Sequence, residues 1–210
     1  MEKMEQIGKA VLDYRFYPED DKYTDGAIED EMLEIARNCS PEQYERVIVE
    51  KKSWPILYHF SYLRENIIRW LPMDGSENVL EIGAGPGAIT GALCEKGRQV
   101  TVIDLSKKRC LINAYRHKDC DNLHFLVGNF QDIEPKLTEQ YDLITLIGVF
   151  EYAQFSIQSE DPFVDYLKRI RTHLAKGGRL VIAIENRIGL KYWAGATEDH
   201  TGIYFEGLEG

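Results

Sequence analysis

The sequence has few of the residues that build metal centres and disulfide frameworks. Its 210 residues include four cysteines and five histidines. The cysteines form no C-x-x-C pair, and the histidines supply no clustered partners for a metal ion. We therefore expect no metal site, and free, mostly buried thiols at Cys39, Cys94, Cys110 and Cys120.

Long apolar runs and basic charge are also scarce. No apolar stretch approaches the roughly 20 residues that span a membrane, and no apolar segment follows a basic amino terminus. Lys and Arg number 25 against 35 Asp and Glu, which gives a formal net charge of -10. Nucleic-acid binders usually present a basic field over their contact face. These features predict a cytoplasmic protein that binds neither membranes nor nucleic acids.

From Asn78 onward the sequence contains a regular alternation of strand and helix patterns. Near-continuous apolar runs of this kind are typical of parallel strands that are covered on both faces. The runs are "NVLEIG", "QVTVID", "LHFLVGN", "YDLITLIG" and "RLVIAIE". Helical patterns lie between them, with Ser106 and Asp161 in N-terminal cap positions. The alternation predicts an α/β fold, a doubly wound Rossmann-like parallel sheet of five strands in the order 3-2-1-4-5.

The first 73 residues have a different pattern. The stretch "SPEQYERVIVEK" opens with a capping box formed by Ser40 and Gln43 and predicts a helix. Further amphipathic and turn-rich segments surround it. We expect residues 1–73 to form a helical extension and residues 74–210 to form the main domain.

The stretch "VLEIGAGPGAIT", residues 79–90, directly follows the first predicted strand. Glycines in this place let the backbone approach a ligand closely. Gly83 and Gly85 fit two cofactors. Together with Ala88, these two glycines have the spacing of a dinucleotide-binding fingerprint. Together with Gly87, they have the spacing of a loop that binds S-adenosylmethionine.

Two carboxylates near this loop bear on the choice of cofactor. Asp104 ends the second strand, where either cofactor needs an acid to hold a ribose. Glu81 precedes the first glycine by two residues, and a carboxylate at about 5 to 6 Å from a pyrophosphate would cost about 3 kcal/mol at an effective dielectric near 20. S-adenosylmethionine carries a sulfonium and an ammonium group and no phosphate. Glu81 therefore favours the methyl donor, and an NAD-dependent oxidoreductase is the remote alternative.

Five motifs in order, "VLEIGAGPG", "VTVIDLS", "VGNF", "YDLITLIGVFEYA" and "LAKGGRLVIAIE", resemble the motif series of class I S-adenosylmethionine-dependent methyltransferases. The resemblance covers roughly residues 78–186. It implies methyltransferase activity with S-adenosyl-L-methionine as co-substrate. It also implies a set of cofactor-binding residues: Glu81, Gly83, Ala84, Gly85, Gly87, Asp104, Leu105, Asn129, Phe130 and Ile147.

The resemblance further implies what these residues do. The glycines shape the turn under the methionine part of the cofactor, and Glu81 helps to hold its ammonium end. Asp104 accepts hydrogen bonds from the ribose, and Leu105 lies against the adenine. Asn129 and Phe130 follow the third strand, where the family usually has adenine contacts, although Phe130 fits an ordinary core position nearly as well.

The methyl acceptor is indicated by the segments that flank the motifs. "GVFEYA" follows the fourth strand in place of the Asn/Asp-Pro-Pro-Tyr sequence of amino-directed nucleic-acid methyltransferases. The segments "ENRIGLKYWAGATEDHTG" and "ILYHFSYLRENIIRWLP" are similar to methyltransferase domains in bacterial proteins of surface-polysaccharide and glycosyl-transfer systems. We therefore expect a small-molecule or glycan acceptor, with a sugar hydroxyl as the leading candidate.

A hydroxyl acceptor would benefit from a general base. His200 is the candidate, because it lies in an unusual segment after the fifth strand, where loops carry function. His59 is the alternative. Glu151 and Glu185 are further candidates, and Glu151 is the less attractive because the family often has an acid there for packing.

The carboxyl-terminal part departs from the resemblance. Class I domains add a helix and two antiparallel strands after the fifth strand, and we expect these strands 6 and 7 to be absent and the domain to be truncated. The fifth strand would then be an apolar edge, which we expect the 186–210 tail or a second copy of the chain to cover. The competing hypothesis is a cofactor-binding module that is inactive by itself and joins a further domain or subunit at this edge.

Overall fold

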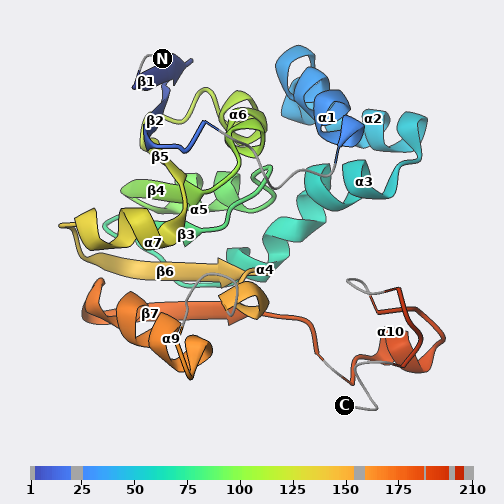
Figure 1. The fold of residues 1–210 in the computed structure, drawn as a ribbon. Coiled ribbons are helices and arrows are strands. Elements are labelled where there is room, and N and C mark those ends of the chain that lie inside the picture. The colour runs from blue at the N-terminus through green and yellow to red at the C-terminus, as the bar shows by residue number, and fades with distance from the viewer. Residues whose placement is uncertain (1–2, 20–25, 154–158, 187, 199–201, 206–210) are drawn as a thin grey trace.

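A seven-stranded sheet runs through the molecule in the order β1-β2-β5-β4-β3-β6-β7 (Figure 1). β1 and β2 pair in antiparallel orientation, and all other neighbours pair in parallel. The strands are β1 (Met4–Ile7), β2 (Ala10–Phe16), β3 (Asn78–Ile82), β4 (Gln99–Asp104), β5 (Leu123–Gly128), β6 (Tyr141–Ile147) and β7 (Leu174–Ala183). The structure is a computed structural model that describes residues 3–19, 26–153, 159–186, 188–198 and 202–205.

Helices connect and cover the strands. They are α1 (Ala27–Asn38), α2 (Tyr44–Lys51), α3 (Trp54–Phe60), α4 (Asn66–Arg69), α5 (Thr90–Lys96), α6 (Lys107–Arg116), α7 (Phe130–Ile133), α9 (Pro162–Thr172) and α10 (Leu190–Trp193). The predicted caps are present. The side chain of Ser106 accepts a hydrogen bond from the backbone of α6, and that of Asp161 accepts one from the backbone of α9.

The core lies on both faces of the sheet. Successive residues of β3 show the division, because side chains alternate along a strand. Val79 packs in a cluster with residues of α4, α5 and α6, whereas Leu80 packs in a second cluster with residues of α7 and α9. Both side chains are almost fully buried. The prediction of parallel strands covered on both faces is thus confirmed for β3 to β6, whereas no residue of β7 is fully buried.

A third hydrophobic cluster joins the amino-terminal helices to this framework. Met32 of α1, Val47 of α2 and Phe60 of α3 pack together and against Ile112 of α6. α1 also lies along α6. The first three helices therefore form an outer layer beside α6, and α3 comes close to the carboxyl ends of the central strands (Figure 1).

Two strands stand where the sequence predicted a helical extension. That prediction is wrong for β1 and β2, which form a hairpin, and β2 pairs in parallel with β5 over Val11–Asp13. Leu12 is fully buried and Asp13 is almost fully buried. The strand was missed because its apolar run is short and interrupted by charge. Asp13 can be buried because Arg15 donates to its carboxylate at 2.8 Å.

The predicted five-stranded sheet and the expected absence of strands 6 and 7 are also wrong, since the described residues build a sheet of seven strands. The two strands beyond the expected five come from the amino terminus and lie next to β5. The five strands from β3 onward run in the order β5-β4-β3-β6-β7, which is the part of the sheet that the apolar runs describe. The boundary at residue 73 between an extension and a main domain remains a prediction.

The described part of the tail does not cover β7 as expected. In the described residues β7 pairs with β6 alone, and the side chain of Ile182 near its end is 38% exposed. Of the tail aromatics, Tyr192 is buried, while Trp193 and Tyr204 are more than half exposed. The tail carries α10 beyond the end of β7 rather than along its edge (Figure 1). A further domain or second subunit at this edge remains a prediction.

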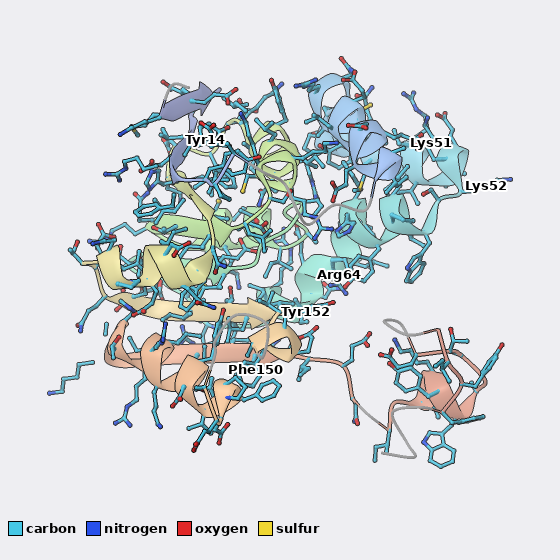
Figure 2. The ribbon with its side chains drawn as sticks, viewed as in Figure 1. Tyr14, Lys51, Lys52, Arg64, Phe150 and Tyr152 are labelled. Atoms are coloured by element: carbon cyan, nitrogen blue, oxygen red, sulfur yellow. The ribbon has the colours of Figure 1, made fainter. Side chains whose placement is uncertain are left out.

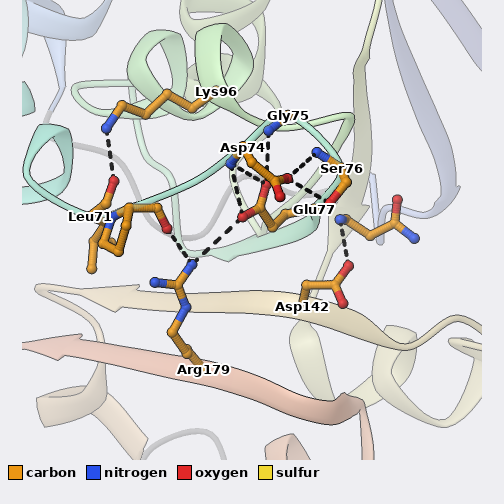
Figure 3. A network of polar contacts seen from close by, with 10 residues as sticks. Leu71, Asp74, Gly75, Ser76, Glu77, Lys96, Asp142 and Arg179 are labelled. Carbon is orange, nitrogen blue, oxygen red and sulfur yellow. Dashed lines mark hydrogen bonds and ion pairs between the residues drawn. The ribbon is translucent and has the colours of Figure 1, made fainter.

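Polar contacts fix the segment that leads from α4 into β3 (Figure 3). Arg179 of β7 donates to the carbonyl of Pro72 at 2.7 Å, and Lys96 of α5 donates to the carbonyl of Leu71 at 2.9 Å. The Glu77 carboxylate accepts the backbone N–H of Gly75 at 3.1 Å. These bonds hold the amino-terminal helices in a fixed relation to the sheet.

Candidate functional site

The loop after β3 requires glycine at three positions. Gly83, Gly85 and Gly87 have φ angles of 71°, 53° and 79°, a region that side chains disfavour. A Cβ atom on Gly83 would lie 2.4 Å from Val149, and one on Gly87 would lie 2.3 Å from the Asn113 side chain. At Gly85 a Cβ would meet nothing within 4 Å. The loop is therefore tightly packed at both ends and open in the middle.

Glu81 lies beneath this loop with 2% of its surface exposed. The hydroxyl of Thr90 donates to its carboxylate at 2.7 Å, and the Asn113 amide donates to that hydroxyl at 2.9 Å. Burial raises the pKa of Glu81 to about 7, which the hydrogen bond from Thr90 opposes and the nearby charge of Asp104 reinforces. Glu81 is thus held in place and titrates near neutrality.

Asp104 ties the end of β4 to the glycine loop. One carboxylate oxygen accepts the backbone N–H of Gly85 at 2.8 Å, and the other accepts the backbone N–H of Ser106 at 2.9 Å. The side chain is 8% exposed. Asp104 therefore has a structural role in the loop in addition to any role toward a ligand.

A cavity of about 120 Å³ opens at the loop. Its floor comes from Glu81, Gly83 and Gly85, and Thr145 of β6 lies beside Glu81 in the sheet register. Among the described residues nothing hydrogen-bonds the buried hydroxyl of Thr145. A buried polar atom without a partner is costly, so this hydroxyl is available to a ligand in the cavity.

Two arginines bring positive charge to the lining of the cavity. The cavity is lined by Arg64, which lies between α3 and α4, by Arg109 of α6 and by His59 of α3. Burial lowers the pKa of His59 to about 3, and the charges of Arg116, Arg109 and Arg64 act in the same direction. A histidine with such a low pKa is neutral at pH 7 and is a weak proton acceptor, which weighs against His59 as a general base.

Arg64 is the least compensated of these arginines. Its guanidinium lies 4.1 Å from the centre of the Tyr58 ring and donates to the Tyr58 hydroxyl at 3.0 Å. Its Nε is buried without a hydrogen-bond partner, and no carboxylate in the described part of the chain forms an ion pair with it. Arg109, by contrast, pairs with Glu29 at 2.7 Å. Arg64 can therefore receive an anionic group.

A second, larger hollow of about 700 Å³ adjoins the cavity. The two share Tyr58, Arg64, Ile147 and Gly148. Figure 2 shows Arg64 and Tyr152 at this junction, where α3 and α4 face the end of β6. The remaining walls of this outer hollow are Trp54, Ile67, Glu151, Tyr152, Ala183, Ile184, Glu185 and Lys191.

The structure brings some of the other predicted residues to this region and not others. Ile147 lines both hollows. Leu105 is 44% exposed beside Asp104, and Asn129 caps α7 by accepting the Gln131 N–H. Phe130 packs in the core at 5.0 Å from the Tyr166 ring, in line with its alternative interpretation. His200 lies outside the described residues.

Several residues at the site were not found from the sequence. Arg64, Arg109 and Thr145 line the cavity, but each occurs in an ordinary helix or strand pattern. Nothing in a sequence pattern distinguishes an arginine that faces a cavity from one that faces solvent. Only the packing of α3 and α6 over the ends of the central strands brings these groups to the loop.

Residues 80–180 match a family model described as a methyltransferase domain. This part of the chain is therefore a methyltransferase domain, and its co-substrate is S-adenosylmethionine. The methyltransferase is 29% identical to an uncharacterised methyltransferase of Staphylococcus carnosus over 72% of this chain and 67% of the relative. It is 27% identical to a protein-L-isoaspartate O-methyltransferase of Dictyoglomus turgidum over 86% of this chain and 79% of that relative.

The methyltransferase also resembles a solved structure of phosphoethanolamine N-methyltransferase 1 from Haemonchus contortus. The TM-score is 0.53 at 18% identity, and the match covers 80% of this chain and 35% of that one. That enzyme was solved with phosphoethanolamine and S-adenosylhomocysteine. At this identity the likeness shows the fold, and the chain spans about a third of the length of that neighbour.

Two further observations concern other kinds of site. None of the described helices has the length and apolar character needed to cross a membrane. Nowhere among the described residues do three or more His, Cys, Asp or Glu side chains gather in a way that could hold a metal ion.

Proposed function

We propose that the methyltransferase binds S-adenosylmethionine along the carboxyl ends of β3, β4 and β6 and transfers its methyl group to a small-molecule or glycan acceptor in the outer hollow. The observation that carries this proposal is the glycine loop, held by Asp104 and open at Gly85, directly above the buried carboxylate of Glu81. When bound, the cofactor supplies a methyl group on a positively charged sulfur. The chain has to align this group with the nucleophile of the acceptor.

The residues present fit the amino-acid end of the cofactor. Glu81 offers a carboxylate to the ammonium group, and the unpartnered hydroxyl of Thr145 lies beside it. Arg64, which lines the same cavity, offers an uncompensated guanidinium to the carboxylate. The lining of the cavity thus carries both signs of charge, as a zwitterion requires.

We propose the remaining cofactor contacts from the positions of the predicted residues. Asp104 accepts from the ribose hydroxyls, and Leu105 contacts the adenine with its exposed side chain. Asn129 lies on the adenine side at the end of β5. Phe130 supports the fold from the core.

The acceptor is proposed to lie in the outer hollow, because that hollow meets the cavity at Gly148. The aromatic faces of Trp54 and Tyr152 support a ring-shaped acceptor such as a sugar. The sugar hydroxyl expected from the sequence, and His200 or His59 as its base, remain predictions. The low pKa of His59 argues for testing His200 first.

Binding and turnover should be measured separately. Calorimetry with S-adenosylhomocysteine tests the cofactor site, and release of S-adenosylhomocysteine from S-adenosylmethionine with a panel of sugars and amines tests transfer. Binding without turnover over a broad panel would favour a cofactor-binding module that needs a partner. Micromolar binding of NADH would contradict the interpretation of Glu81.

Arg64→Met is expected to lower the affinity for S-adenosylhomocysteine by about 10- to 100-fold, which is the usual loss when a hydrogen bond to a charged group is removed. The same change should leave the affinity for 5′-methylthioadenosine unchanged, because this analogue lacks the amino-acid part. Calorimetry with both ligands makes the comparison. Arg46→Met, an exposed arginine on α2, is the control for the change in net charge. Equal losses for the two ligands would show that Arg64 does not hold the carboxylate.

The titration of Glu81 predicts how pH affects folding and binding. Its pKa is about 7 in the folded chain and near the ordinary value of 4.5 in the unfolded chain. Between these values the folded chain holds the extra proton, so the contribution of Glu81 to the free energy of unfolding falls as pH rises from about 4.5 to about 7.

Binding of S-adenosylhomocysteine places an ammonium group beside Glu81 and favours its carboxylate form. We therefore expect the release of up to about one proton on binding at pH 6, and an affinity that falls by up to about tenfold per pH unit below 7. Calorimetry in buffers with different ionisation enthalpies measures the protons released. Glu81→Gln should bind more weakly and release none. Proton uptake by the unmodified chain would refute the contact.

A further inference from the structure

Glu151 lies where the two hollows meet. It belongs to the short 3-10 turn Phe150–Tyr152, which follows β6 after Gly148. One of its carboxylate oxygens is 3.9 Å from the position that a Cβ atom on Gly148 would occupy. Gly148 lines both hollows, whereas Glu151 lines the outer one alone. The carboxylate is therefore on the acceptor side of the boundary that the methyl group has to cross.

The two carboxylates of the outer hollow differ in their partners. Glu185 accepts from Lys191 at 2.9 Å and from the Tyr192 hydroxyl at 3.1 Å, so both of its oxygens are occupied. Oε2 of Glu151 is buried and has no hydrogen-bond partner in the part of the chain that the structure describes. No cationic side chain among those residues forms an ion pair with it. Glu151 is thus the uncompensated acid of the hollow.

A partly buried carboxylate without a counter-charge is unfavourable, and a ligand that brings both a hydrogen-bond donor and a positive charge relieves it. A hydroxyl group supplies only the donor. An ammonium group supplies both, and the aromatic side chains of Trp54 and Tyr152, which line the same hollow, favour a cation as well. The net charge of -10 also favours cationic ligands.

We propose that the acceptor is an amine and that Glu151 binds its ammonium group. This inference rests on the proposed function, in which Arg64 is assigned to the cofactor and leaves Glu151 to the acceptor. An ammonium nitrogen has no free electron pair for attack. Glu151 therefore takes one proton from it, the N–H electron pair stays on nitrogen, and the proton passes from the carboxylate to solvent. The amine would replace the sugar hydroxyl as the accepting group, while a sugar body remains compatible with the aromatic walls.

Matched pairs of probes separate an amine from a hydroxyl. We suggest benzylamine against benzyl alcohol, and methyl 2-amino-2-deoxy-β-D-glucopyranoside against methyl β-D-glucopyranoside. Each is titrated at pH 7 into the full chain saturated with S-adenosylhomocysteine. In at least one pair the amine is expected to bind about tenfold more tightly than its alcohol, because a charge-assisted hydrogen bond replaces a neutral one.

Glu151→Gln keeps the shape of the side chain and removes its charge. It should reduce the affinity for the amine to that for the alcohol. Glu160→Gln, an exposed residue outside the hollow, changes the net charge equally and should keep the amine preference. The proposal is overturned if amine and alcohol bind alike, if neither binds, or if Glu151→Gln keeps the preference. Failure of S-adenosylhomocysteine to bind would instead count against the proposed function.

Discussion

Replacing Asp104 by alanine is expected to reduce both the stability of the chain and its affinity for S-adenosylhomocysteine. The change leaves the backbone N–H groups of Gly85 and Ser106 without their acceptors. An unsatisfied buried donor costs about 1–3 kcal/mol, so the loss of two acceptors should lower the free energy of unfolding by roughly 2–6 kcal/mol. Loss of the ribose contacts should weaken binding by a further 1.5 to 3 kcal/mol or so. Urea unfolding and calorimetry measure the two effects.

The stability loss must not be mistaken for a binding defect. Binding is therefore measured at a temperature at which circular dichroism shows the variant to be folded. Asp104→Asn keeps one acceptor oxygen. Its stability and its affinity for S-adenosylhomocysteine should therefore lie between those of the original chain and those of Asp104→Ala. Asp119→Ala, at an exposed position after α6, should change neither quantity. A folded Asp104→Ala variant with unchanged affinity would show that Asp104 does not hold the ribose.

Gly83→Ala is expected to have the second large effect. The new Cβ atom would lie 2.4 Å from Cγ2 of Val149, and the backbone would keep a φ angle of 71°. Strain at such a φ angle and overpacking together cost roughly 2–5 kcal/mol. The loop can relieve the clash only by moving away from its ligand-binding conformation. We expect a lower melting temperature and a loss of S-adenosylhomocysteine binding of at least about tenfold.

Gly85→Ala is the matched comparison for stability. Its φ angle of 53° is also positive, but its Cβ would meet no atom within 4 Å. Only the backbone strain remains, so the loss of stability should be about 1 kcal/mol. Combining Gly83→Ala with Val149→Ala removes the clashing methyl groups and should recover part of the stability. Equal destabilisation by Gly83→Ala and Gly85→Ala would show that the contact with Val149 is not the cause.

The sequence by itself determined the central sheet and its glycine loop. The strands β3 to β6 are largely buried on both faces, so each had to be a nearly continuous apolar run, and such runs are visible without a structure. The caps at Ser106 and Asp161 are local interactions within one turn of chain, which also makes them visible. Glu81, Gly83 and Asp104 come together because each follows or ends a parallel strand, and parallel strands end at the same edge of a sheet.

Other features depended on contacts between segments that are distant in the sequence. Leu12 and Asp13 become part of a strand because β5 offers a free edge, a fact that local propensity does not contain. The course of the tail is a second example, because its described residues carry α10 beyond the end of β7, and the aromatic content of the tail does not reveal this path.

The charges of the site were decided by tertiary packing in the same way. Arg64 lines the cavity because α3, α4 and α6 cover the carboxyl ends of the strands. Within the outer hollow Lys191 pairs with Glu185, while Oε2 of Glu151 has no partner among the described residues. Whether a charged side chain forms an ion pair depends on its neighbours from other helices and strands, and these neighbours cannot be identified from a single sequence. The glycine loop and its two carboxylates were therefore predictable from the strand order, whereas the positions of Arg64, Thr145 and Glu151 at the two hollows required the fold.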